Sequence, residues 1–377
     1  MTLPLTEVLR ALEQLAPLQL AEDWDNVGLL IDPREAGREL DVTRILVTID
    51  ATDRVVDEAI RLRADLLVAY HPPLFRPQKR WSARAQRLPF AAARHDFAVY
   101  SPHTALDAAA GGLNDWLAEA FGTCRSEPIV PVTRTALGAE CKLVVFVPEA
   151  QQDTLRAALA RAGAGRIGNY AECSFGLNGE GTFFGQEGTN PAVGGALQLE
   201  RVREVRLEMV CDRAALPAIQ AAIAEHHPYE EPAWDVYPLL PAPSPTTGAG
   251  RRLKLEQPLT LEKVIQRVKQ HLGVAQLRVA ASPEHQRGAP IQHVALGAGA
   301  AGSLLDGAAS AELILTGEMR HHDVLAHLQR GRSVVLSEHT HTERGYLPRL
   351  RDRLLAALTD SVEIFVSEVD EDPLVTV

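Results

Sequence analysis

Short apolar runs alternate with helical segments in the first part of this 377-residue chain, and this alternation limits the possible folds more than any other feature. The predicted strands are the apolar runs at residues 44–50, 66–69 and 97–100. Residues 52–63 and 84–94, which lie between them, have the apolar spacing of helices. Strands that alternate with helices pair in parallel through crossover connections. We therefore predict an α/β domain over residues 1–130.

A block of different character follows, from residue 135 to residue 240. Its predicted elements run strand, helix, two strands, helix, strand, which is the order of a ferredoxin-like α+β fold. Residues 241–250 are rich in proline, serine and glycine and are typical of a linker. Residues 250–377 then return to α/β alternation. The sequence thus predicts a metal-binding α/β core of two parts, interrupted by an inserted ferredoxin-like domain.

Histidines and carboxylates follow several of the predicted strands, and they are the reason for expecting a metal. His71 comes after one buried run, Asp107 lies beyond another, and His339 and Glu343 follow the run at residues 334–336. Ligands of open α/β sheets gather at the carboxyl ends of strands. Two imidazoles and two carboxylates without a thiolate suit a catalytic site for Zn, Fe, Mn, Co or Ni. We expect one or two such divalent ions per chain.

Each of these residues alone also has a structural explanation. A single histidine after a strand, such as His71, is most often structural. Asp107 could cap the start of a helix, which is a common role of aspartate. His339 and Glu343 are four residues apart and could form a surface pair on one helical turn. The metal interpretation therefore rests on the four residues together.

Further polar residues are candidates for roles beside the metal. His103 is suited to acid–base work because histidine titrates near neutral pH, so we assign catalytic roles to His103 and Glu343. His321 and His322 open a predicted helix, where they either form a polar face or contact substrate. Residues 297–302 match the glycine pattern of dinucleotide folds, but a turn whose backbone amides meet an anion at a helix start is the better explanation.

Composition argues against several classes of function, although a local basic patch for nucleic acid stays open. The net charge of −11 is spread along the chain, which argues against a basic footprint for nucleic acid. No apolar run reaches the length of about 18 residues that a membrane span needs, and no secretory signal opens the chain. The 4 cysteines form no C-x-x-C pair and indicate a reduced, cytoplasmic protein.

Taken together, these motifs resemble the Nif-three-like (NGG-one-interacting factor three) dinuclear metal-centre hexamer family, also labelled GTP cyclohydrolase 1 type 2 homologues. Residues 22–30, Glu-Asp-Trp-Asp-Asn-Val-Gly-Leu-Leu, are similar to its N-terminal signature. Residues 163–170 and 227–232 are similar to segments of the inserted module in its long members. That resemblance implies a PII/CutA-like fold for the inserted module.

The resemblance also implies roles for single residues. His71, Asp107 and Glu343 would hold a first ion, and His339 with Glu343 a second. Tyr70 stands where many members have a further histidine, and a phenol is a poorer ligand than imidazole, so we expect weaker occupancy of the second site. Tyr70 is then a candidate for contact with substrate or with the ligands. The family fold implies a toroidal homohexamer with its metal sites facing an inner cavity.

Two functions remain open. The first is a metal-dependent hydrolase that acts on a small anionic or nucleotide-like substrate, with GTP ring opening suggested by the family label. The second is a metal-loaded scaffold or regulatory binding protein whose inserted module senses a ligand. Fold and family do not fix chemistry.

Overall fold

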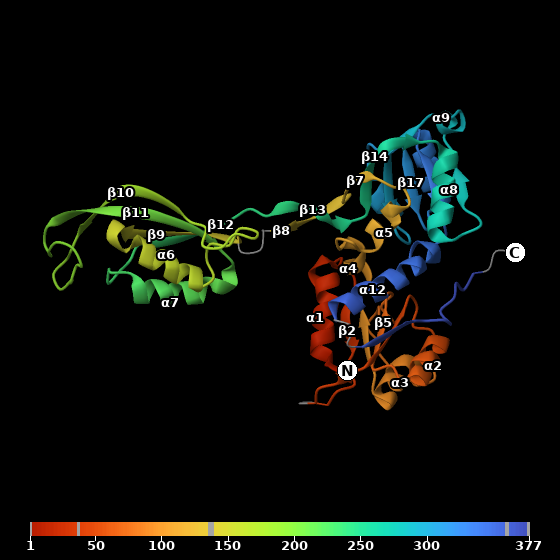
Figure 1. Ribbon diagram of the computed structural model, residues 1–377, viewed down its shortest axis with the longest axis horizontal. Helices are drawn as coiled ribbons and strands as arrows, with labels where there is room; N and C mark the ends of the chain where they lie inside the picture. The colour runs from red at the N-terminus through yellow and green to blue at the C-terminus, as the bar shows by residue number, and fades with distance from the viewer. Residues whose placement is uncertain (1, 36–37, 135–138, 359–361, 375–377) are drawn as a thin grey trace. The chain divides into compact units, whose positions relative to one another are not determined.

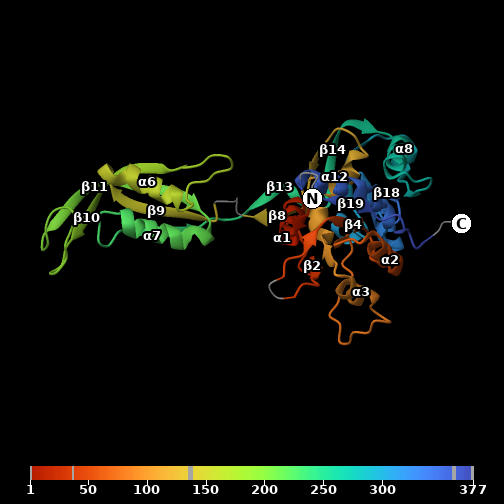
Figure 2. The ribbon, with the colours of Figure 1, turned by 60° about the horizontal axis from the view of Figure 1, so that its bottom comes forward.

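The computed structural model describes residues 2–35, 38–134, 139–358 and 362–374 (Figure 1). The chain forms two compact units. The first comprises Met1–Val132 and Ser244–Val377, and the second comprises Thr133–Pro243. The architecture is mixed α/β, with several sheets and covering helices (Figure 2).

The first sheet of unit 1 is built around a parallel core. Its strand order is β19-β4-β5-β6-β2, with the bounds Glu363–Val366, Arg44–Thr48, Leu66–Ala69, Ala98–Ser101 and Gly28–Ile31. Strands β19, β4, β5 and β6 pair in parallel, as the alternating sequence predicts. The edge strand β2 is antiparallel to β6.

Alternate residues of these strands face opposite layers of helices. Ile45 and Val47 of β4 belong to one buried cluster, together with helices α1 (Leu5–Leu15) and α12 (Leu347–Ala357). Leu46 belongs to another, with α2 (Asp53–Leu62) and α3 (Arg87–His95). Successive side chains of a strand point to opposite faces, and helices cover both faces of this sheet. The strand residues therefore form a continuous apolar run.

The second sheet of unit 1 has the order β15-β18-β17-β16-β14-β7. The bounds are Arg278–Ala280, Ser333–Leu336, Leu313–Thr316, Ile291–Gly297, Arg251–Leu259 and Cys124–Glu127. Strands β16, β17 and β18 are parallel, and the outer strands are antiparallel to them. Helices α5 (Leu113–Glu119) and α8 (Leu261–Leu272) contribute to the buried cluster on one face. Helices α10 (Gly302–Leu305) and α11 (His321–Gln329) contribute to the cluster on the other.

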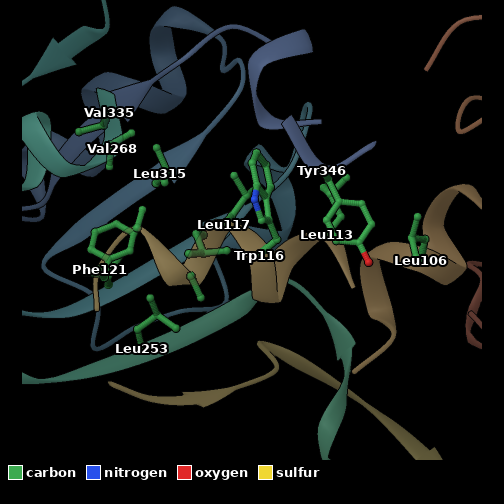
Figure 3. Packing of buried hydrophobic residues seen from close by; sticks show 14 of the residues in the cluster. Leu106, Leu113, Trp116, Leu117, Phe121, Leu253, Val268, Leu315, Val335 and Tyr346 are labelled. Carbon is green, nitrogen blue, oxygen red and sulfur yellow. The ribbon is translucent and has the colours of Figure 1, made fainter. Parts of the chain in front are cut away.

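The largest buried cluster joins the two parts of unit 1. Trp116 and Phe121, within and just after α5, pack with residues of the second sheet such as Leu253 and Leu315 (Figure 3). Tyr346, which precedes α12, belongs to the same cluster. Segments from the start and the end of the chain therefore share one core.

Short elements complete this unit. They are β1 (Leu3–Pro4), which pairs with β3 (Asp41–Val42), the helices α4 (His103–Ala108) and α9 (Pro283–Gln286), and the 3-10 turns η1 (Leu18–Leu20), η4 (Thr340–Thr342) and η5 (Arg344–Tyr346). No described helix is long and apolar enough to cross a membrane.

Unit 2 has its own sheet and its own core. Its elements are β9 (Cys141–Pro148), η2 (Glu149–Gln151), α6 (Gln152–Arg161), β10 (Phe175–Phe184), β11 (Leu199–Cys211), η3 (Arg213–Ala215), α7 (Leu216–His226) and β12 (Trp234–Pro238). The sheet order is β10-β11-β9-β12, and every pair is antiparallel. Side chains of α6 and α7, including Leu155 and Ile219, pack in one cluster with Val145 and Leu207 of the sheet.

The predicted linker at residues 241–250 is wrong. Residues Ala242–Ala249 form the strand β13, which pairs with β8 (Val130–Arg134) in a two-stranded sheet. The prolines concealed this strand, because proline lacks an N–H group and is tolerated only where that group is not needed for pairing.

Candidate metal centre

Five strands of unit 1 end at the candidate centre. Asp50 follows β4, Tyr70 and His71 follow β5, and His103 follows β6 in the first sheet. From the second sheet, Glu318 follows β17 and His339 follows β18. Each strand is buried, whereas the residue after its carboxyl end is free to carry a polar side chain into a shared space.

Three of the predicted ligands come together. One ligand atom each from His71, His339 and Glu343 lie within 4.8 Å of one another. The Nε2 atom of His339 is 3.1 Å from Oε1 of Glu343, and Nε2 of His71 is 3.5 Å from Oε2. Glu343 lies between η4 and η5, so two 3-10 turns rather than one α-helical turn bring His339 and Glu343 to face each other.

Each of the two imidazoles is held from behind by a carboxylate. Nδ1 of His71 is 2.9 Å from Oδ1 of Asp50, and Nδ1 of His339 is 2.7 Å from Oε1 of Glu318. This pairing fixes the Nδ1–H tautomer and directs Nε2 toward Glu343. Arg344 in turn donates to Oδ2 of Asp50 at 2.9 Å.

The pKa values of His71, His339 and Glu343 depend on one another, because the three side chains are paired. Although burial opposes it, pairing with Asp50 and Glu343 raises the pKa of His71 to about 10. Pairing with Glu343 likewise raises the pKa of His339 to about 9. Burial alone would raise the pKa of Glu343, but the two imidazoles outweigh it and lower that pKa. A positive charge is therefore favoured at this position, and a metal ion would take the place of the imidazole protons.

Glu343 has an unsatisfied oxygen. The residue is 2% exposed, and its Oε2 atom makes no hydrogen bond among the described residues, since the nearest donor, Nε2 of His71, stands 3.5 Å away. A buried carboxylate oxygen without a donor is costly unless a cation binds it. The donor set, with two imidazole nitrogens and one carboxylate, fits a divalent transition ion.

Asp107 lies beside this cluster rather than within it. It is in the last turn of α4, so it does not cap the start of a helix. Its Oδ1 atom accepts a hydrogen bond of 2.7 Å from the hydroxyl of Tyr70. Burial raises the pKa of Asp107 to about 6, although the Tyr70 hydroxyl acts in the opposite direction. Tyr70 is buried and its pKa is raised well above the ordinary value, so its hydroxyl keeps its proton and serves as a donor.

The glycine-rich segment at residues 297–302 lies against the ligands. A Cβ atom on Gly299 would stand 2.9 Å from Nε2 of His339 and 3.0 Å from Oε1 of Glu343. The backbone amides of Ala298 and Gly299 donate to Asn114 and Thr342, at 3.0 and 2.8 Å. These amides are engaged within the protein, and α10 is a single short turn, so the expected anion site at a helix start is not supported.

A cavity of about 530 Å³ opens onto these groups. His103, Asp107, His339 and Glu343 line it, and Trp24 lies at its wall. No lysine or arginine is among the described residues that line this cavity. His103 faces it with an exposed side-chain fraction of 16%, while Nδ1 of its ring is 2.8 Å from a carboxylate oxygen of Asp25.

The remaining predicted candidates lie apart from the cluster. His321 and His322 are exposed at the start of α11, where their rings pack edge to face, and they do not line the cavity. His341 of η4 is also outside the three-residue cluster, and its Nδ1 atom is 2.6 Å from the backbone oxygen of Ser337.

Sequence reasoning missed Asp50, Glu318 and Gly299. The rule that located the histidines would have found the two carboxylates, since both follow strand ends. The glycine pattern at residues 297–302 predicts an anion site, and only the packing shows that Gly299 lies against His339 and Glu343.

Comparison with known proteins gives a consistent result. A family model described as Duf34/NIF3 (NGG1p interacting factor 3) matches residues 3–373. The chain is 36% identical to NIF3-like protein 1 of Bos taurus, over 98% of this chain and 92% of that protein. It is 37% identical to the GTP cyclohydrolase 1 type 2 homolog of Halalkalibacterium halodurans, over 97% of each. A solved Bacillus cereus protein related to NIF3 superposes with a TM-score of 0.77 at 32% identity, covering 100% of this chain and 99% of its own.

Proposed function

The chain belongs to the Duf34/NIF3 (NGG1p interacting factor 3) family, and we propose that it is a metal-dependent hydrolase of a small substrate. The observation that carries this proposal is the buried carboxylate of Glu343, which has one oxygen without a donor and faces two oriented imidazoles. Such a group is costly to keep in a structure unless it binds a cation. Homologues named after GTP cyclohydrolase are in keeping with hydrolysis.

The proposed ligands are His71, His339 and Glu343, and Asp107, which lies beside them and is bonded to Tyr70, would complete the set. A divalent ion held there would act as a Lewis acid toward an oxygen atom of water or substrate. Asp50 and Glu318 orient the two imidazoles, and Glu343 would supply the carboxylate that holds the ion. His103 lines the same cavity and carries protons during the reaction.

The side chains that line the cavity limit the class of substrate that it can bind. We predict a small anionic or nucleotide-like compound from the sequence, and the described lining contains acidic groups but no lysine or arginine. A triphosphate would therefore find no lysine or arginine to pair with among the described residues that line this cavity. A base-like ring with little charge, placed against Trp24, suits the cavity better than intact GTP. A screen that compares guanosine with GTP tests this preference.

The experiment begins with protein purified without chelator. We expect one or two divalent ions per chain by elemental analysis and turnover of at least one compound in a hydrolase screen. Glu343→Gln removes the charge at the centre and should lose the metal and the turnover while the chain stays folded. Glu284→Gln, which makes the same change at an exposed position, should retain both. Metal-free protein with full turnover would contradict the proposal.

We infer further that unit 2 is an inserted ferredoxin-like module of PII/CutA type, corresponding to residues 135–240. Its order of elements and its antiparallel sheet support this. We also propose that the protein is a homohexamer, with its metal sites facing an inner cavity, and that it works in the cytoplasm, where free thiols such as those of Cys141 and Cys211 persist.

The alternative is a metal-loaded scaffold or regulator whose module senses a ligand. A cavity of about 320 Å³ within unit 2, lined by Phe146, Phe183 and Tyr229, favours it. The alternative would be supported if the protein binds metal and assembles without any turnover, and if a ligand binds in this cavity.

A further inference from the structure

We propose that Asp25 is a positioning residue that holds His103 with its Nε2 atom toward the cavity, so that the pair serves as the proton carrier of the metal centre. Its role in turnover rests on the proposed hydrolase function. The orientation of the ring rests only on the contacts of these two residues. His103 then acts as a base beside the metal rather than as another ligand.

Asp25 is built into the protein as a buried carboxylate. Its side chain is 0% exposed, and its two oxygens lie 2.8 and 2.9 Å from Nδ1 of His103. The backbone N–H of Thr104 donates to Oδ2 at 3.1 Å, and the Thr104 hydroxyl donates to the same oxygen. Although burial raises the pKa of Asp25, these bonds outweigh it and lower the pKa. The carboxylate therefore stays ionised and accepts the Nδ1–H of the imidazole.

The other edge of the His103 ring is left for the cavity. Nδ1 is engaged by Asp25, and no partner of Nε2 is found among the described residues. The ring packs edge to face with Tyr70 and His71, at centroid distances of 5.4 and 5.5 Å. The arrangement matches those of His71 with Asp50 and His339 with Glu318, but His103 is not part of the three-residue metal cluster.

The backbone of His103 is strained in a way that fits a functional role. Its φ angle is +25°, in the left-handed range that residues with a Cβ atom seldom adopt. Strain of this kind persists only where surrounding contacts enforce it, and it gathers at active sites. Asp25 bonds both to the ring of this residue and to the next residue, Thr104.

In hydrolysis, the pair would move one proton in each direction. Nε2 of His103 takes a proton from the attacking water as the water oxygen bonds to the substrate. The imidazolium then returns that proton to the leaving group as the bond to the leaving group breaks, so the ring ends neutral. Asp25 stabilises the charged ring between these steps and does not itself change protonation.

The test compares Asp25→Asn with Asp23→Asn, which removes the same charge from an exposed position two residues away. The rate at which diethyl pyrocarbonate modifies each histidine is followed by peptide mass spectrometry on the metal-loaded protein, with the exposed His95 as internal reference. We expect Asp25→Asn to slow the modification of His103 by about tenfold, since one charge-assisted hydrogen bond is lost. Asp23→Asn should leave the rate unchanged.

Turnover supplies the second readout. Asp25→Asn should lower kcat by about a hundredfold and leave KM and metal content unchanged. If Asp25→Asn does not fold, Asp25→Ser removes the carboxylate with a smaller polar side chain and should slow His103 modification in the same direction. Equal modification rates in the Asp25 and Asp23 variants, or a loss of metal with Asp25→Asn, would overturn the inference. Absence of turnover in the wild type would count against the hydrolase, while the modification rates would still decide the role of Asp25.

Discussion

Gly299 illustrates how closely the backbone approaches the candidate ligands. Its φ angle is +58°, and an added Cβ atom would meet both His339 and Glu343 at 3.0 Å or less. We expect Gly299→Ala to weaken metal binding by at least about tenfold, because displaced ligands lose their geometry. Gly273→Ala is the matched control, since Gly273 has a φ of +68° and open space around its Cβ position. Titration of both variants with Zn²⁺ measures the difference, and equal affinities would show that Gly299 does not shape the site.

Tyr70 contacts one of the predicted ligands. Its hydroxyl donates to Oδ1 of Asp107 at 2.7 Å. Tyr70→Phe should therefore destabilise the metal-free protein by about 1–3 kcal/mol, because it leaves a partly buried carboxylate without its donor. Tyr237→Phe removes a hydroxyl that reaches Asp235 at 3.4 Å on the surface and should have little effect. Urea unfolding of both variants tests this prediction. Equal unfolding midpoints would show that the Tyr70 hydroxyl does not stabilise the protein through Asp107.

The sequence located His71, Asp107, His339 and Glu343 because each follows a predicted strand, and the structure places three of them in one cluster. Their role as metal ligands stays a prediction. Asp25, Asp50 and Glu318 carry no local signal of their partners, because the histidines that they hold lie far away in the chain. Contacts of this kind arise from the packing of the strands and not from local spacing.

At the scale of elements, the buried parallel strands were predictable and the sheet edges were not. Strands β4, β5 and β17 are continuous apolar runs because both of their faces are covered. Strand β13, in a two-stranded sheet, carries prolines and polar residues on exposed faces, which hid it behind a linker-like composition. Edge strands tolerate such residues, so hydrophobic periodicity detects them poorly.

The contact between α8 and α5 provides a prediction about pH. His271 of α8 packs on Trp116 of α5 with ring centroids 4.6 Å apart, and its Nε2 atom is buried without a partner among the described residues. Burial lowers the pKa of His271 below its ordinary value of 6.5, although the nearby Glu119 acts in the opposite direction and Arg349 in the same one.

The direction of the pH dependence follows from the number of protons that His271 binds in the folded and the unfolded chain. Below about pH 6.5 the unfolded chain holds more protons at this residue than the folded chain, so its contribution to stability is lost as the pH falls through that value. His271→Phe keeps a ring on Trp116 and removes the titration. Urea midpoints at pH 7.5 and pH 5.5 should differ less in the variant than in the wild type. Equal differences in both proteins would contradict the assignment.

At the scale of the whole molecule, each of the two units has its own core, so we predict that unit 1 folds without unit 2. Unit 1 and unit 2 each have buried clusters drawn from their own residues. Strands β8 and β13 pair with each other, so a short turn can join them when residues 135–240 are removed. The shortened protein should fold and bind the same amount of metal per chain as the full chain. Loss of folded, metal-binding protein would show that unit 2 is needed for the core.

The central claim is that His71, His339 and Glu343 hold a metal ion, and anomalous diffraction at a transition-metal absorption edge tests it most directly. Crystals of protein purified without chelator should show an anomalous peak within about 2.0–2.2 Å of both Nε2 atoms and of a Glu343 carboxylate oxygen. A second, adjacent peak that shares Glu343 is compatible with the account. Crystals that show no anomalous peak between these three side chains, from protein to which Zn²⁺ has been added, would contradict it.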